Sequence, residues 1–150
     1  MKRIDLKTYT KPTDFVKFPI GETKLILISE GGMIKKHGMK TATSYIPLGN
    51  CTEKSDCEFC LKGNEPKLKW MWVAYVNSEV KVLDVGPMIG DGICQSAQEH
   101  NLSEFTNAIF SITRIGTQRN TKYTVKYIGQ NKEKLDIENA KKLLVKKYFI

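Results

Sequence analysis

The feature that most constrains this chain is one polar segment, residues 37–60, which concentrates a histidine and three cysteines. Within it, Cys57 and Cys60 stand in C-x-x-C spacing. Two thiolates at this spacing can bind one ion from a tight turn, because the intervening backbone folds back and directs both sulfurs inward. Cys51 supplies a third sulfur, and His37 is the nearest histidine in the sequence. The pattern predicts a closed Zn2+ site formed by His37, Cys51, Cys57 and Cys60.

Two other interpretations of the cysteines are less consistent with their surroundings. A redox dithiol is expected in a strand–helix context, whereas residues 61–66 (LKGNEP) have the composition of a loop. A disulfide would require a secreted chain, and residues 1–5 lead into polar sequence rather than an apolar signal segment. We expect a structural metal, because four protein ligands leave no open position for activating water. The isolated Cys94 is expected to be a small buried apolar residue.

Charge points to a polyanionic partner. The 150 residues include 24 Lys and Arg against 16 Asp and Glu, for a formal net charge of +8. Such an excess on a small domain favours nucleic acid, although a charge that serves only solubility is the alternative. No apolar window is long enough to cross a bilayer, so the sequence predicts a protein of a reducing cytoplasm with no membrane partner.

Periodicity predicts a mainly β chain. Alternating or β-branched apolar runs indicate strands at 22–29, 41–46, 67–77, 80–85, 105–115 and 121–128. The Gly31-Gly32 pair is expected to end the first strand. Helical spacing follows Pro87 up to about residue 99. A second helix, capped by Asp136, is expected to present an apolar stripe made of Ile137, Ala140, Leu144 and Tyr148.

The order of these elements predicts a fold class. Two strands, the metal loop, two strands, a helix, two strands and a final helix match the five-stranded Greek-key barrel of the OB-fold. We therefore expect an OB-fold barrel over residues 1–130, with a zinc-binding insertion at about 31–66 and a C-terminal helix in 131–150. An α+β sheet with a zinc knuckle is the competing architecture, and periodicity alone leaves it open.

Several short motifs carry a family resemblance. FPIGET at 18–23, the His37 and cysteine set, PKLKW at 66–70, VKVL at 80–83, and ITRIG at 112–116 with TKYTV at 121–125 follow one another in this order. Together they resemble the replicative single-stranded DNA-binding proteins of tailed bacteriophages. The relatives in question are the zinc-containing helix-destabilising proteins of T-even-type phages and their shorter cousins. The resemblance spans residues 15 to 128.

The resemblance implies an OB-fold core, a zinc-bearing subdomain beside it, and a basic cleft between them that holds a single strand. It implies roles in phage replication, recombination and repair in the host cytoplasm, with replication or recombination proteins as partners and self-association along DNA. Its metal ligands fall on the four residues above. The chain departs from the family in ending with a basic segment, residues 146–150, where the relatives often carry an acidic tail. A basic N-terminal arm is only faintly matched by Lys2, Arg3 and Lys7.

Binding a single strand without sequence preference requires cations along the phosphates and flat rings for the bases. In OB-folds the second and third strands and the loop between the last two strands make these contacts. Trp70 and Trp72 share a strand face that is more often core, which leaves Met71 and Tyr75 on the face expected to be exposed. We expect Tyr75 and one tryptophan to stack on bases. The candidate nucleic-acid residues are Lys40, Tyr45, Lys67, Lys69, Trp70, Trp72, Tyr75, Lys81, Arg114, Arg119, Lys122 and Lys126.

Catalytic motifs are missing from the sequence. A zinc deaminase requires H-x-E and P-C-x-x-C, but Gly38 and Met39 follow His37. No phosphate-binding G-x-x-x-x-G-K-[ST] loop or serine elbow occurs either. We predict a non-enzymatic protein that binds single-stranded DNA. The alternative is a zinc-stabilised protein- or RNA-interaction module of a viral transcription or replication complex.

Overall fold

The structure is a computed structural model that describes residues 14–149, and for Tyr45 the backbone alone. Antiparallel strands dominate the described part, so the prediction of a mainly β chain with a C-terminal helix is confirmed. The predicted N-terminal arm lies outside the described residues. None of the described helices has the length and apolar character to span a membrane. The elements are β1 (Gly21–Leu27), β2 (Gly32–Lys40), β3 (Tyr45–Asn50), α1 (Glu58–Leu61), β4 (Lys67–Val76), β5 (Glu79–Val85), α2 (Pro87–Glu99), β6 (Ala108–Ile115), the short 3-10 helix η1 (Gln118–Asn120), β7 (Lys122–Gln130) and α3 (Glu138–Tyr148).

Strand β4 is the centre of the sheet. It pairs with β5 along one edge, while on the other edge it pairs first with β2 and then, near its end, with β1. Beyond β1 the sheet continues through β6 to β7. Residues 67–76 suit this position because β-branched and aromatic side chains occur on both of the strand's faces. The strand predicted at 67–77 is therefore confirmed.

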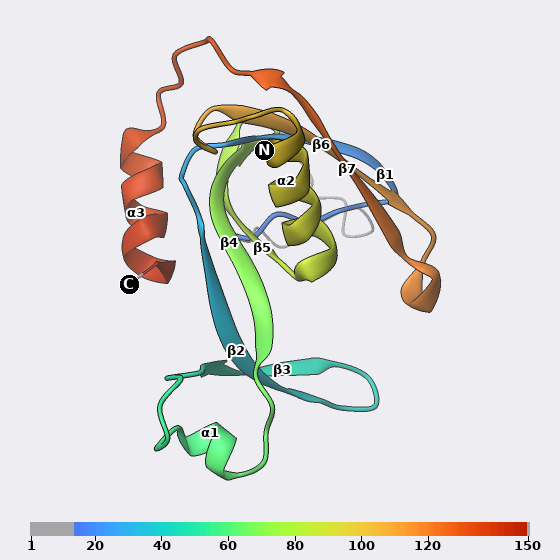
Figure 1. Cartoon of the computed structure of the whole chain (residues 1–150), viewed down its shortest axis with the longest axis vertical. Coiled ribbons are helices and arrows are strands. Elements are labelled where there is room, and N and C mark those ends of the chain that lie inside the picture. Colours follow the sequence, from blue (N-terminus) through green and yellow to red (C-terminus); the bar gives the residue numbers. More distant parts are fainter. Residues whose placement is uncertain (1–13, 150) are drawn as a thin grey trace, which may run out of the picture.

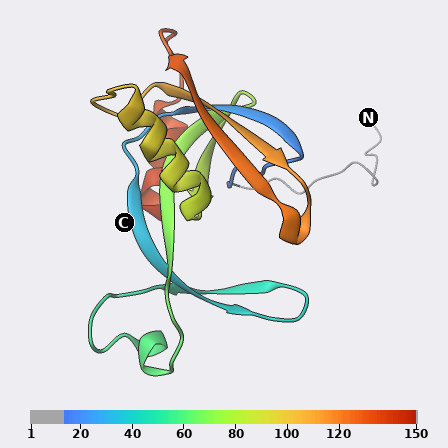
Figure 2. The ribbon, with the colours of Figure 1, turned by 45° about the vertical axis from the view of Figure 1, so that its right-hand side comes forward.

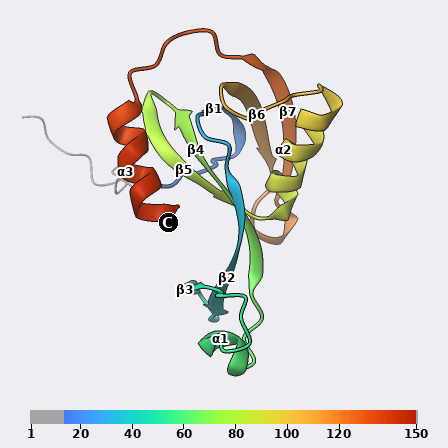
Figure 3. The ribbon, with the colours of Figure 1, turned by 60° about the vertical axis from the view of Figure 1, so that its left-hand side comes forward.

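Both faces of β4 are covered, each by a different helix (Figures 1 and 3). Trp72 lies in the inner core, which also contains Ile93 of α2 and Phe110 of β6. Met71 and Val73 lie in the outer core, which α3 closes with Leu144. Met71 is only 3% exposed, so the prediction that its face would be open to solvent is wrong. Sequence alternation assigned the faces correctly, but α3 covers the second one.

Glycine allows helix α2 to approach the sheet. A Cβ on Gly90 would lie 1.9 Å from the Trp70 ring, closer than any side chain allows. The glycine therefore creates the flat surface on which Trp70 rests, and Trp70 in turn stacks on Trp72 with ring centroids 5.6 Å apart. The helix occupies the residues predicted for it, and its glycines are explained by close packing.

The prediction of a second strand at residues 41–46 is wrong, because β2 (Gly32–Lys40) and β3 (Tyr45–Asn50) flank a turn there. The chain turns at Gly31, where φ is +75° and a Cβ would lie 2.3 Å from Trp72 Nε1. A strand then begins at once as β2 and runs to Lys40. Residues 41–44 form a turn closed by the Thr41 amide on the Ser44 carbonyl, 2.8 Å away, and β3 returns from there. Residues 33–40 (MIKKHGMK) show no apolar alternation. Backbone pairing with β4 and β3 holds this strand in place, so it does not require a regularly alternating apolar face.

Residues Gly32–Lys36 of β2 pair with Lys67–Met71 of β4 and form a ribbon that leads away from the body of the sheet. At its end lie β3 and α1, well separated from the remaining elements (Figures 1 and 2). We refer to residues 37–66 as the head and to the other described residues, apart from the ribbon, as the body. The metal loop thus lies between strands of one sheet, as predicted.

Helix α3 begins later than predicted. Its first residue is Glu138, the preceding cap residue is Ile137, and no side chain caps the helix, so the prediction that Asp136 caps it is wrong. Leu144 of the predicted stripe is buried, whereas Ala140 is exposed. The helix packs on β4 and β5, and Lys147 Nζ donates to Asp14 Oδ2 at 2.9 Å.

Candidate metal centre and ribbon groove

The head brings the four predicted ligands together from three places in the sequence. His37 comes from β2, Cys51 follows β3 directly, and the Cys57–Cys60 pair brackets the start of the short helix α1. Their ligand atoms, one imidazole nitrogen and three sulfurs, lie within 4.8 Å of one another. A turn of helix is what the C-x-x-C spacing requires, because it places both sulfurs on the same side of the backbone.

The distances fit a tetrahedral ion. Cys51 Sγ lies 3.9 Å from Cys57 Sγ and 3.6 Å from Cys60 Sγ. The sulfurs of Cys57 and Cys60 each lie 3.4 Å from His37 Nε2. Tetrahedral zinc, with bonds of about 2.3 Å to sulfur and about 2.0 Å to nitrogen, separates two sulfurs by about 3.8 Å and sulfur from nitrogen by about 3.5 Å. The cluster can therefore hold a metal ion, and both its donors and its dimensions suit zinc.

A second residue orients the histidine. Asn64 Oδ1 lies 2.7 Å from His37 Nδ1, and Asn64 Nδ2 donates to the Gly38 carbonyl at 2.9 Å. Because the amide oxygen accepts only from a protonated Nδ1, the lone pair is left on Nε2, which faces the sulfurs. Asn64 thus selects the tautomer that binds metal and ties the loop after α1 to β2. Sequence analysis missed this role, since an asparagine in a loop carries no distinctive signal.

The pKa values of two of the thiols are shifted in opposite directions. Backbone N–H groups of Cys60 and Thr52 lower the pKa of the Cys57 thiol to about 5. Desolvation and the neighbouring sulfurs of Cys51 and Cys57 raise the pKa of Cys60 to about 12. Without a metal ion, these shifts favour the thiolate form of Cys57 and oppose a second thiolate at Cys60. A divalent ion reverses this, because its charge allows several thiolates to lie together.

The geometry indicates a structural ion. His37 is 1% exposed and Cys57 2%, and the Phe59 ring lies 5.3 Å from the His37 ring. With three sulfurs and one nitrogen around it, a tetrahedral ion has no position left for water. An ion bound by all four donors would therefore hold the head together.

Both tryptophans pack toward the inner core. Trp72 is fully buried, and Trp70 is half-buried against Gly90 with its Nε1 enclosed. Trp72 belongs to the core, contrary to its prediction as a stacking residue, and Trp70 is packed against the same core. Tyr75 is half-buried and packs against the outer core. The side chain of Tyr45, another predicted stacking residue, lies outside the described part of the chain.

The predicted cations fall into separate groups. Lys67 and Lys69 lie on the β4 face that continues into Met71. Around the last hairpin, Arg119 is exposed in η1, and Lys122 and Lys126 are exposed on β7. Because β1 and β6 lie between β4 and β7, three strand spacings of about 4.8 Å separate the two groups along the sheet.

Three further predicted cations have other surroundings. Arg114 Nη1 donates to the Phe18 carbonyl at 2.8 Å and its Nε is buried, so this side chain holds the N-terminal segment to β6. Lys81 forms an ion pair with Glu79 at 3.3 Å. Lys40 is exposed at the end of β2.

Two hollows of about 290 and 320 Å³ lie beside the ribbon, and Asn50 lines both of them. Tyr148 and Phe149 line the first, and Lys36 and Lys69 line the second. Asp84 also lines the second and forms a 2.7 Å ion pair with Lys36. We call the two hollows together the ribbon groove. Sequence analysis missed its aromatic end, because only the fold brings α3 beside β2.

In comparisons with protein-family models, curated proteins and solved structures, no model, protein or structure matches this chain.

Proposed function

We propose that the chain binds single-stranded DNA, largely without sequence preference, along the ribbon groove. The observation that carries this proposal is that half-buried rings line one hollow beside the ribbon and lysines line a second, with Asn50 lining both. Tyr148 and Phe149 offer ring surface to unpaired bases, and Lys36 and Lys69 offer charge to phosphates. Lys67 lies on the same face as Lys69 and extends the row of cations toward the head.

Charge in the groove supports a polyanionic ligand. Asp84 forms its ion pair with Lys36, and Lys69 lines the same hollow. The formal net charge of +8 adds long-range attraction to the same ligand.

The connectivity supports an OB-type body. Strand β1 pairs with both β4 and β6, and α2 lies in sequence between β5 and β6. In an OB-fold the first strand likewise pairs with the second and fourth, counting β4, β5, β6 and β7 as the last four. The proposed protein is therefore an OB-type barrel whose first two strands are separated by a metal-stabilised head. The phage resemblance supplies the setting, in which such a protein protects single strands during replication, recombination and repair.

The test is a titration of labelled oligo-dT at several salt concentrations, with duplex DNA and RNA as competitors. We expect tight binding that weakens with salt and is displaced poorly by duplex. Replacing Lys69→Gln should lower the slope of log affinity against log salt by about 0.7, the value for one phosphate contact on a single strand. Lys132→Gln is the matched control, because residue 132 lies in the β7–α3 connection, at the opposite end of the molecule from α1 (Figure 1).

Each outcome of this titration has a meaning. Absence of oligo-dT binding, or binding indifferent to salt, would overturn the proposal. An equal loss in both lysine variants would show that overall charge, rather than the groove, attracts DNA. Stronger displacement by RNA than by single-stranded DNA would favour the RNA-interaction alternative.

A further inference from the structure

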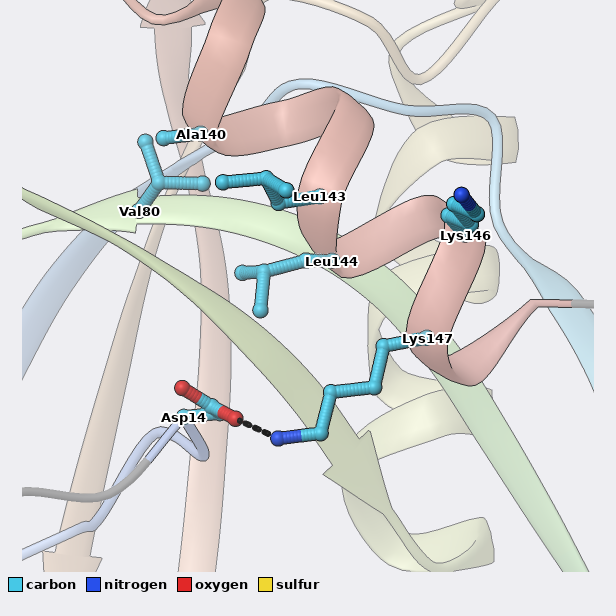
Figure 4. Close-up of a pocket in the computed structure, with 7 residues that line it drawn as sticks. All are labelled: Asp14, Val80, Ala140, Leu143, Leu144, Lys146 and Lys147. Atoms are coloured by element: carbon cyan, nitrogen blue, oxygen red, sulfur yellow. Dashed lines mark hydrogen bonds and ion pairs between the residues drawn. The ribbon is translucent and has the colours of Figure 1, made fainter.

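A second groove lies between α3 and β5. Tyr148 and Phe149, which line the ribbon groove, do not line this one. Its volume is about 640 Å³. Figure 4 shows its apolar wall, in which Val80 of β5 faces Ala140, Leu143 and Leu144 of α3. Openings of this size commonly receive ligands or side chains of a partner.

Leu143 distinguishes this groove from ordinary packing. The leucine after it, Leu144, is 8% exposed and closes the outer core, whereas Leu143 is 69% exposed and lines the groove. Folding of the body therefore makes little use of Leu143. A large apolar side chain left open beside an apolar hollow is characteristic of a binding surface.

The charged residues of the groove are mainly basic. Lys146 and Lys147 line one end, and Asp14 is the acidic residue there. Asp14 Oδ2 already accepts bonds from Lys147 and from the Tyr148 hydroxyl, at 2.9 and 2.8 Å. Lys146 has no acidic partner among the described residues. The groove thus presents leucine and valine surface next to an uncompensated cation.

Charge also argues against one occupant from the chain itself. Residues 1–13 precede Asp14 and contain four basic residues and one acidic residue. A segment of this composition has the same sign of charge as Lys146 and does not complement it. The occupant that complements this surface carries carboxylates beside apolar side chains.

We propose that the α3–β5 groove docks an acidic amphipathic helix of a partner protein. Its apolar stripe would cover Leu143 and Val80, and its carboxylates would meet Lys146, in the helix-in-groove mode of recognition. The proposal does not depend on DNA binding, because it uses residues outside the ribbon groove.

The experiment measures binding of a labelled designed peptide of about four helical turns, with leucines on one face and glutamates on the other. A peptide of the same composition in scrambled order is the reference. We expect the ordered peptide to bind the full-length protein more tightly than the scrambled one. Leu143→Ser and Lys146→Glu should each weaken it by at least about fivefold, roughly the loss of one good contact. Their matched controls, Leu61→Ser at a leucine 71% exposed in the head and Lys132→Glu, should not.

Three results would overturn the proposal: equal binding of the scrambled peptide, no effect of either α3 variant, or an equal loss of oligo-dT and peptide binding in Lys146→Glu. The last would assign the groove to nucleic acid. Leu143 and Lys146 are both largely exposed, so the variants are expected to fold, and circular dichroism and thermal unfolding verify this.

Discussion

The head and the body are stabilised by different means. The body has two apolar cores, one under α2 and one under α3. Among the described side chains of the head, only His37 and Cys57 are buried, and both belong to the cluster that can hold a metal ion. Four of its apolar residues are exposed: Met39 by 49%, Ile46 by 42%, Leu48 by 36% and Leu61 by 71%. Burial therefore accounts for the body, and a metal ion in the cluster would supply the stabilisation that the head lacks.

This difference explains why the two regions can have such unlike sequences. A segment of 30 residues with little apolar burial cannot offset the conformational entropy that it loses on folding. Binding of an ion by four ligands adds a large local free energy without requiring a core. The head is therefore free to keep polar and basic residues at its surface.

Removing the metal should have the largest effect, and a local one. Structural zinc contributes about 10–16 kcal/mol in apparent binding free energy at neutral pH, so chelation or Cys57→Ser should unfold the head. Hydrogen exchange should show loss of protection across residues 37–66, while β1, β6 and α2 remain protected. Cys94→Ser, half-buried in α2 and outside the cluster, is the control.

Unfolding of both regions in a single transition on chelation would contradict their separate stabilisation. An absence of metal from protein purified without chelators would contradict the metal's role in the head.

The converse change should weaken the body and spare the metal centre. Trp72→Ala leaves a cavity in the inner core, for which a loss of about 3–5 kcal/mol in unfolding free energy is expected. Denaturant unfolding measures this loss, and metal analysis of the folded variant should still find one ion. Leu61→Ala, at an exposed leucine, should leave the unfolding free energy nearly unchanged. A similar loss in both variants would contradict the assignment of the core.

A smaller effect should separate the two roles of Asn64. Asn64→Ala removes the acceptor for His37 Nδ1–H, and loss of such an outer contact lowers metal affinity by about 10- to 100-fold. Competition with a chromophoric chelator measures it. Asn64→Asp keeps the acceptor but loses the donor to the Gly38 carbonyl, so its affinity should fall less. Unchanged affinity in Asn64→Ala would show that the sulfurs alone orient the histidine.

The smallest expected effect concerns α3. Hydrogen bonds from Lys147 and the Tyr148 hydroxyl hold the pKa of Asp14 below its ordinary 3.8. A carboxyl whose pKa is lowered on folding stabilises the folded state above its unfolded pKa, and this contribution is lost as the pH falls through the lowered value. Protection of α3 amides should thus be constant above about pH 5 and decline in acid, slightly, because both groups are largely exposed. Asp14→Asn should abolish the decline of α3 amide protection in acid. If the decline were unchanged in this variant, other carboxyl groups would be its cause.

The parts that could be predicted from sequence are those fixed by local spacing. The Cys57–Cys60 pair determines its own geometry, and once three sulfurs are in place a nearby histidine completes the set. Strand β4 and helix α2 were likewise predictable, because apolar periodicity and Pro87 are local signals. The four ligands are confirmed as one cluster for this reason.

The parts that could not be predicted depend on distant partners. Strand β2 has no apolar alternation, and only its pairing with β4 makes it a strand. The alternation of β4 cannot reveal that α3, more than sixty residues later, covers Met71. The ribbon groove requires Phe149 to lie beside Gly32 and Asn50, a proximity that no short window contains.

One feature of β4 has a mechanical consequence. The strand runs unbroken from Lys67 to Val76, with β2 beside its first half and β1 beside its last residues. Tension between the head and the body would therefore be shared by the two strand backbones in parallel, with little load on the hydrogen bonds between them. The register of β2 is irregular between His37 and Gly38, where the strand passes into the head, so bending of the head is expected at that point.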